Sequence, residues 1–225
     1  MTGLTEKAVD PQAALAGRGD DARARWEESM LRQVEALRAS VRSQPPEALA
    51  ARAGAVYADG GLRLAYWGQD VLVAWPSLEP RLEASGAACP VFDTAMLLYY
   101  LKTADGAELS ERWIGFRELP DGAFYNLAYQ RYSGDRLARA FGTDPEGFHA
   151  AAHALGGARL AALGHAHAFT PLPRLRLAAV LWPGDDEFPA QGAVLFDASA
   201  GHYMTTDGLA LLGGGLAGRL EKAQP

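Results

Sequence analysis

The sequence contains a single cysteine, Cys89, among its 225 residues, and this scarcity excludes several kinds of site. One thiol cannot form a disulfide within the chain, and it cannot supply a four-cysteine cluster or a cysteine-only zinc site. No neighbouring base would activate the thiol, and Pro90 follows it directly. We therefore expect Cys89 to be buried and unreactive, and the low cysteine content favours a reducing compartment.

Long apolar runs and an excess of positive charge are also missing. No stretch of about 18 apolar residues exists to span a membrane. The N-terminus, "MTGLTEKAVDPQAALAGRGDD", has no apolar segment of signal-peptide length. The net charge is −6, whereas nucleic-acid binding needs a basic face. These absences predict a cytoplasmic protein that contacts a small-molecule ligand or a protein partner, with no nucleic acid and no membrane.

What is present is enough apolar sequence for a core, since 49% of the residues are hydrophobic. Residues 1–20 lack periodicity and predict a mobile tail, whereas residues 21–225 predict a single globular α+β domain. Asp21 to Ser43 predicts a helix that ends before Pro45-Pro46. Its apolar stripe recurs at helical spacing and is expected to cover the core, with a partner-binding helix as the alternative. The stripe consists of Trp26, Met30, Val34, Leu37 and Val41.

The middle of the chain alternates hairpin and helix signals. Gly60–Pro76 predicts a hairpin whose two-residue turn is Gly68-Gln69. Asp93 is expected to cap a buried helix through "TAMLLYYLK". "AFYNLAYQRY" predicts a helix with a tyrosine stripe, which is more typical of a core than of a cofactor pocket. Thr143 or Asp144 is expected to cap the next helix, "PEGFHAAAHAL".

The last third of the chain predicts a β-hairpin and a closing helix. "RLRLAAVLW" and "GAVLFD" are the strands, and "TTDGLALLGGGLAGRL" is the helix. Three consecutive glycines cost this helix roughly 3 kcal/mol against alanine, so they indicate tight packing or a break. The predicted fold is therefore α+β, with a mostly antiparallel sheet built from hairpins and packed by an N-terminal, a central and a C-terminal helix.

The segment "GDDEFPAQGAVLFDAS" holds two groups of acids that could form one site or two. In the predicted hairpin, Asp185, Asp186 and Glu187 lie in the loop, whereas Asp197 lies at the far end of the second strand. Six or seven residues at about 3.3 Å each separate them by roughly 20 Å, which one metal cannot bridge. We expect the acidic loop to be structural, either solvated or docked on an arginine.

Asp197, Ser199 and His202 form a possible hydrolase set within six residues. The pattern lacks the Gly-x-Ser-x-Gly elbow of serine hydrolases. The simpler interpretation is that Asp197 or Ser199 caps the turn after the strand.

Four of the five histidines fall into two pairs. His149 and His153 are four apart on a predicted helix, and His165 and His167 are two apart on a predicted strand. The spacing permits a zinc site, but the first pair lies off the apolar face and lacks the glutamate of helical metalloproteases. We expect solvent-facing histidines and no bound metal.

Three segments together resemble an uncharacterised prokaryotic family of domains of unknown function, known mainly from anaerobic bacteria and archaea. They are "WIGFRELPDGAFY", "ARAFG" and "LPRLRLAAVLWPGDDEFPAQGAVLFDASAGHYMTTDGLALLG", within roughly Pro46 to Leu220. Some members look fused to a four-cysteine iron–sulfur domain of the kind found beside corrinoid proteins. The resemblance implies a setting in anaerobic corrinoid or iron–sulfur metabolism, and it implies no activity or cofactor.

The matching residues focus attention on the turn at Arg117-Glu118, which Pro120 and Gly122 would fix in place. Arg117 could grip Asp186 or Glu187 in the acidic loop, or it could form the rim of a pocket. The candidate polar site is thus Arg117, Glu118, Tyr125, Asp197, Ser199 and His202. We expect a binding or accessory module of unknown ligand. The alternative is a hydrolase or metal-assisted enzyme that uses Asp197, His202 and Glu118 for acid–base chemistry.

Overall fold

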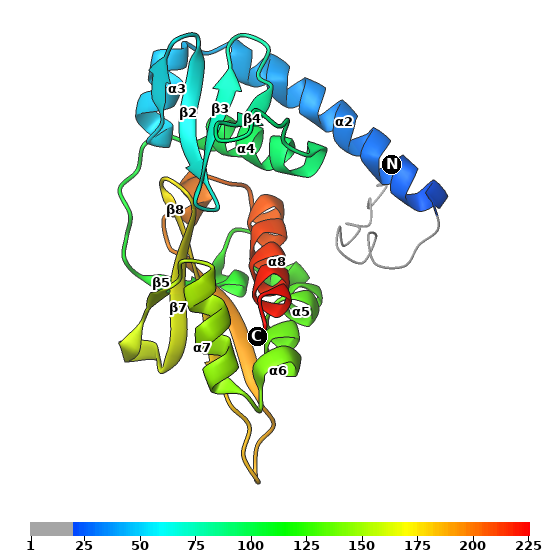
Figure 1. Cartoon of the computed structure of the whole chain (residues 1–225), viewed down its shortest axis with the longest axis vertical. Coiled ribbons are helices and arrows are strands. Elements are labelled where there is room, and N and C mark those ends of the chain that lie inside the picture. Colours follow the sequence, from blue (N-terminus) through cyan, green and yellow to red (C-terminus); the bar gives the residue numbers. More distant parts are fainter. Residues whose placement is uncertain (1–19) are drawn as a thin grey trace.

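Two antiparallel sheets with helices around them make up the computed structural model, which describes residues 20–225 (Figure 1). The tail predicted over residues 1–20 lies outside this part except for Asp20, and the side chains of residues 20–27 also lie outside it. The helices are α2 (Asp20–Arg42), α3 (Pro46–Ala53), α4 (Val91–Thr103), α5 (Gly122–Tyr132), α6 (Gly134–Phe141), α7 (Pro145–Ala154) and α8 (Thr206–Lys222). Short 3-10 turns are η1 (Phe116–Glu118), η2 (Ala161–Leu163) and η3 (Ala200–His202).

The first sheet has the strand order β1-β2-β3-β4, and the second has the order β5-β9-β8-β7-β6. The first contains β1 (Val56–Ala58), β2 (Gly61–Tyr66), β3 (Gln69–Ala74) and β4 (Pro80–Leu82). The second contains β5 (Trp113–Gly115), β6 (Ala158–Arg159), β7 (His165–Leu172), β8 (Leu175–Trp182) and β9 (Gln191–Asp197). All pairings are antiparallel, so the predicted α+β class with hairpin-built sheets is confirmed.

The β2–β3 hairpin forms where it was predicted, but its turn is one residue earlier. Tyr66 pairs with Gln69, so the two turn residues are Trp67 and Gly68, with φ angles of 50° and 76°. Both angles are positive, as a turn with two left-handed residues requires. The prediction of Gly68-Gln69 was wrong because a tryptophan at positive φ is uncommon, and the rule for glycine-first turns favoured the other register.

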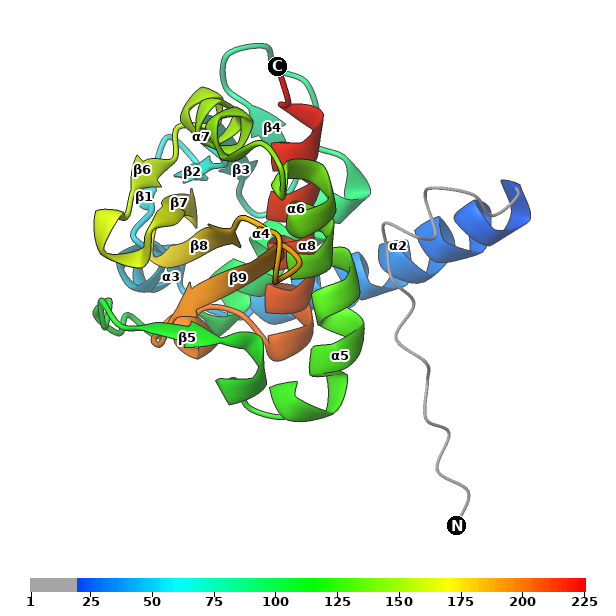
Figure 2. The ribbon, with the colours of Figure 1, turned by 90° about the horizontal axis from the view of Figure 1, so that it is seen from below.

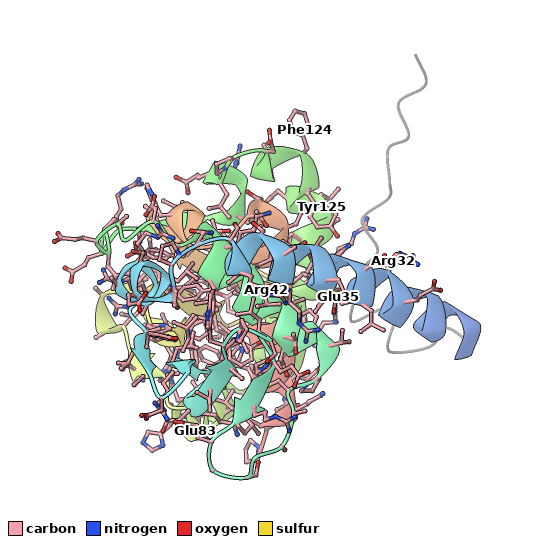
Figure 3. The ribbon with its side chains drawn as sticks, turned by 90° about the horizontal axis from the view of Figure 1, so that it is seen from above. Arg32, Glu35, Arg42, Glu83, Phe124 and Tyr125 are labelled. Carbon is pink, nitrogen blue, oxygen red and sulfur yellow. The ribbon has the colours of Figure 1, made fainter. Side chains whose placement is uncertain are left out.

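The N-terminal helix α2 packs along α4 through the predicted stripe. Met30, Val34, Leu37 and Val41 are buried, whereas the side chain of Trp26 lies outside the described residues. The first turns of α2 extend past the rest of the molecule (Figures 1 and 3). Helix α4 begins at Val91, two residues before the predicted cap. Asp93 instead accepts a hydrogen bond of 2.8 Å from the Tyr66 hydroxyl and so fixes the first sheet to α4.

Helices α5, α6 and α8 lie together beside β8 and β9 (Figure 2). Helix α8 is unbroken through its three glycines, which decides between the two predicted explanations in favour of tight packing. A Cβ on Gly213 would come within 2.1 Å of the Tyr129 hydroxyl, and one on Gly214 within 2.7 Å of the Tyr132 ring. The tyrosine stripe of α5 is therefore core, as predicted, and the glycines make room for it.

The two sheets share one hydrophobic core. The Trp67 amide donates to the Pro171 carbonyl at 2.9 Å, which joins the tip of the β2–β3 hairpin to β7. The buried Tyr100 hydroxyl of α4 donates to the Ala53 carbonyl at 2.6 Å and accepts from the Arg174 amide at 3.0 Å. Cys89 is only half-buried, less than expected, and desolvation followed by the charge of Asp93 raises the pKa of its thiol.

Candidate functional site

The turn η1 and the start of α5 are fixed by hydrogen bonds and by packing. The Glu118 carboxylate accepts the Gly115 amide at 2.7 Å, and the Pro120 carbonyl accepts the Thr206 hydroxyl at 2.7 Å. Beneath the turn, Phe116 stacks on Tyr129 with ring centroids 4.1 Å apart. A Cβ on Gly122 would lie 2.0 Å from the Phe116 carbonyl oxygen, so only glycine fits there. The turn is therefore held rigidly from both sides.

Arg117 projects from this fixed turn into solvent. Among the described side chains, residues 28–225, no carboxylate lies at ion-pair distance from its guanidinium, so the predicted grip on Asp186 or Glu187 is not formed. The prediction failed because the η1 turn and the acidic loop are fixed by separate local contacts. Tyr125, one turn into α5, is half-buried with its ring 6.4 Å from that of Phe116.

The acidic loop is held by hydrogen bonds between its own residues. One carboxylate oxygen of Asp185 accepts the amides of Glu187 at 2.9 Å and Phe188 at 2.7 Å. The Phe188 amide, followed by that of Glu187, lowers the pKa of Asp185. The loop follows Trp182 and Gln191, the last paired residues of the β8–β9 hairpin. It extends away from the body of the molecule (Figure 1). Asp185 thus shapes a solvent-exposed loop, as one of the two predicted structural roles requires.

Asp197 lies at the opposite end of the same hairpin, as predicted. Strand β9 starts at Gln191 beside the acidic loop and ends at Asp197. Six residues at about 3.3 Å each separate the two ends by roughly 20 Å. The two groups of acids therefore cannot share a metal ion.

The buried Asp197 carboxylate acts as a structural hub. It accepts the amides of Ser110 at 3.0 Å, Glu111 at 2.8 Å and Ser199 at 2.9 Å, and the Ser199 hydroxyl at 2.6 Å. Burial by itself would raise the pKa of Asp197, but the hydrogen bonds from Ser199 and Ser110 outweigh it and leave the pKa lowered. The predicted cap of the turn after the strand is confirmed, and the same carboxylate also holds the segment that leads into β5.

The possible hydrolase set does not assemble as a relay. Ser199 donates its hydroxyl proton to Asp197 and not to His202, which is the base that would activate the serine in such a set. His202 pairs through Nδ1 with the Asp105 carboxylate, at 2.7 Å. The hydrogen bond from His202, followed by that from the Ala107 amide, lowers the pKa of Asp105. The six candidate residues therefore fall into three places: the η1–α5 turn, the Asp197 hub and the exposed His202–Asp105 pair.

The histidines form a network across the predicted pairs instead of within them. His149 Nδ1 lies 2.8 Å from His167 Nε2, and His149 Nε2 lies 2.9 Å from His165 Nδ1. Arg159 lies 3.2 Å from His149 Nδ1. His167 is buried, so the expectation of solvent-facing histidines is wrong for this residue, whereas His153 is exposed.

This network joins α7 to β7, and its geometry differs from that of a metal site. The two nitrogens of His149 face different histidines, so the three rings do not aim at one point. Among the side chains of residues 28–225, no group of three His, Cys, Asp or Glu is arranged to hold a metal ion. Desolvation, followed by the charge of Arg159, lowers the pKa of His149. Desolvation also lowers the pKa of His167, against the opposing effect of the Gly157 carbonyl.

Comparison with known proteins places the chain in a family. A family model described as a domain of unknown function (DUF3786) matches residues 45–219. The chain belongs to the DUF3786 family. No curated protein and no solved structure matches it. The family resemblance predicted from the sequence is confirmed, and the match to DUF3786 spans both sheets, the Arg117 turn and the histidine network.

Sequence reasoning missed Asp105, Ser110 and Arg159, and the distance along the chain explains the first two. Asp105 lies 97 positions from His202, and Ser110 lies 87 positions from Asp197. No local signal was available for the histidines and Arg159, because the network depends on how α7 packs against β7, and β6 and η2 lie between these elements in the sequence. Among the residues whose placement is described, no helix of the DUF3786 domain is long and apolar enough to cross a membrane.

Proposed function

We propose that this DUF3786 domain is a binding or accessory module that recognises an anionic group through Arg117. The supporting observation is that Arg117 is exposed and has no ion-pair partner among the side chains that the structure describes, while the turn that carries it is fixed. A guanidinium binds a carboxylate or phosphate at two points. Because the turn that carries Arg117 is fixed, less conformational entropy is lost on binding. The ligand is a small molecule or a protein segment that carries such a group.

Asp197, the first carboxylate on which the predicted catalytic function would depend, is occupied, because it accepts hydrogen bonds from three amides and one hydroxyl. A general base needs a free lone pair directed at the substrate proton, so Asp197 supports a structural role better than an acid–base role. Within the described part of the chain, Glu118 accepts only the Gly115 amide and keeps free lone pairs, but it lies in the η1–α5 turn and not beside Asp197 or His202. The setting that we propose, anaerobic corrinoid or iron–sulfur metabolism, is supported by the family resemblance.

The Arg117 proposal is tested by NMR of arginine side chains. Titration with inorganic phosphate, and separately with acetate, should shift the Arg117 Nε–Hε resonance. Arg139, exposed on α6, is the matched control and should shift much less. Arg117→Lys should keep the thermal melt unchanged, because no folded-state partner is lost, and should weaken anion binding. Equal small shifts at both arginines would refute specific recognition by Arg117.

The contact between His202 and Asp105 supports a catalytic function as a second candidate. His202 is oriented through Nδ1 by Asp105, which leaves Nε2 available as a general base. This alternative replaces Asp197 with Asp105 as the orienting carboxylate. It predicts a hydrolytic activity, on a panel of ester and phosphoester substrates, that His202→Gln and Asp105→Asn both abolish. More than half of each side chain is exposed, and catalytic dyads work best where water is excluded, so we rank this alternative second.

A further inference from the structure

The outer face of α5 is apolar where a surface helix is normally polar. Phe124 is 94% exposed and Leu127 is 72% exposed. With Arg131 they lie within about 60° of one another around the helix, opposite the buried Tyr129. Phe124 stands at the outer edge of the molecule (Figure 3), and α5 lies at the periphery when the molecule is seen from below (Figure 2). The outer stripe of α5, defined by Phe124, Leu127 and Arg131, is therefore open to a partner.

The apolar stripe is flanked by opposite charges. Asp121 precedes the first turn of α5, and Arg131 lies in its last turn. Both side chains are exposed, and neither has an ion-pair partner among the side chains of residues 28–225. The stripe thus runs from an acid through two large apolar side chains to a base.

Two copies of this stripe in antiparallel orientation would place the acid of each copy opposite the base of the other. Asp121 lies five positions before Asn126 and Arg131 lies five positions after it. At 1.5 Å per residue, Arg131 is about 7.5 Å from the level of Asn126 along the helix axis. Asp121 is the N-cap residue, with a φ of 57°, and lies just beyond the first residue of the helix on the other side. An antiparallel copy of α5, related by a two-fold axis at that level, places Asp121 of each copy opposite Arg131 of the other. Phe124 then lies against Leu127 of the other copy.

We propose that the domain forms a two-fold dimer through the outer stripe of α5. A two-fold contact uses the same surface on both copies and is the commonest form of protein oligomer. A parallel arrangement would bring like charges together. The contact is small by the standard of permanent dimers, so the association is reversible and depends on concentration. This inference does not rest on ligand binding by Arg117.

The experiment is sedimentation equilibrium of the full chain from low micromolar to near-millimolar concentration. The wild type should show a monomer–dimer equilibrium, and Phe124→Asp should abolish it. Phe188→Asp is the matched control, because Phe188 is another exposed phenylalanine, in the β8–β9 loop, and it should leave dimerisation unchanged. Thermal melts should show that all variants are folded, since both side chains are largely exposed.

A charge exchange then tests the antiparallel register. Asp121→Lys alone and Arg131→Glu alone should each weaken dimerisation by roughly tenfold, because two symmetry-related pairs are lost together. An equimolar mixture of the two variants should form a heterodimer, since every facing pair is then of opposite charge. A wild type that stays monomeric at all concentrations would overturn the proposal and indicate a different protein as the partner. A mixture that fails to associate, beside a wild type that does, would overturn the antiparallel register.

Discussion

Single residues explain why α8 tolerates three consecutive glycines. Gly213 faces the Tyr129 hydroxyl, which is buried and has no hydrogen-bond partner among the described residues. Gly214 faces the Tyr132 ring, whereas a Cβ on Gly215 would meet nothing within 4 Å. The three positions therefore differ in function although the sequence shows them as one run. Two are required by close packing and the third is free.

We expect Gly213→Ala to destabilise the protein by about 1–3 kcal/mol, because the new methyl group overpacks against Tyr129. Gly215→Ala, the matched control, should stabilise it by up to about 1 kcal/mol through helix propensity. Tyr129→Phe in the Gly213→Ala background should recover part of the loss, since it removes the clashing oxygen without breaking a hydrogen bond. Urea denaturation measures all three. A Gly213→Ala protein as stable as Gly215→Ala would contradict the packing argument.

Asp197 provides the second prediction at the residue scale. Asp197→Asn should cost about 1.5–3 kcal/mol, because charge-assisted hydrogen bonds to two segments are lost. The folded-state pKa of Asp197 is lowered from its ordinary value of 3.8, so the unfolded state binds its proton more readily. The stability that the carboxylate contributes is therefore present above the ordinary pKa and disappears as the pH falls through the folded pKa.

Denaturation of wild type and Asp197→Asn across the acid range checks this. The difference between them should be full at neutral pH and should shrink below the ordinary pKa. Asp185→Asn, in the exposed acidic loop, is the control and should have a small effect at every pH. If the difference in unfolding free energy between the two proteins does not change with pH, the shape of the Asp197 side chain contributes to stability and its charge does not.

At the scale of elements, the histidine network is a contact between α7 and β7 that tolerates little added charge. Each of its two links needs one N–H donor and one bare nitrogen. The three neutral rings satisfy both links. Because Arg159 can only donate to His149 Nδ1, one added proton is accommodated on His167 Nδ1, which faces the Gly157 carbonyl. A second proton removes an acceptor and breaks a link. Arg159 adds positive charge beside His149, His153 lies on the same helix, and Glu146 is the acid that opposes them.

Stability should therefore fall as the pH decreases through the normal histidine range. The folded-state pKa values of His149 and His167 are lowered from 6.5, so the unfolded state binds protons more readily. The stability is full above the unfolded pKa and is lost as the pH falls below it. Denaturation between pH 7 and pH 5 should show a smaller loss for His149→Gln than for the wild type. His153→Gln removes a neighbouring charge but no hydrogen bond of the network, so it should change the slope much less than His149→Gln. An unchanged slope for His149→Gln would contradict this account.

The same elements show how far sequence reasoning reaches. The stripe from Met30 to Val41 was predictable because helical spacing is a local property that burial preserves. The β8–β9 hairpin was predictable for the same reason, and it placed Asp197 correctly. The histidine network was not predictable, because it depends on how α7 packs against β7. Asp197 was recognised as a turn cap, but its bonds to Ser110 and Glu111 cross 87 and 86 positions.

At the scale of the whole molecule, Tyr100 joins the two sheets. Its hydroxyl contacts the Ala53 carbonyl from the segment before β1 and the Arg174 amide from the turn between β7 and β8. Its ring also stacks on that of Tyr203, with centroids 5.9 Å apart. One buried side chain of α4 therefore links the end of α3, which leads into the first sheet, to the β7–β8 turn of the second sheet, which makes the two halves depend on each other.

Tyr100→Phe should leave the Ala53 carbonyl and the Arg174 amide without their partner and cost about 1–3 kcal/mol. The matched control is Tyr66→Phe, which removes a hydroxyl that bonds to Asp93 within the first half of the molecule. Hydrogen exchange distinguishes the two roles. Tyr100→Phe should speed exchange in both sheets, because it weakens the contact between them, whereas Tyr66→Phe should act mainly on β2 and α4. If Tyr100→Phe speeds hydrogen exchange only in the first sheet, the two halves are held together by their apolar core alone.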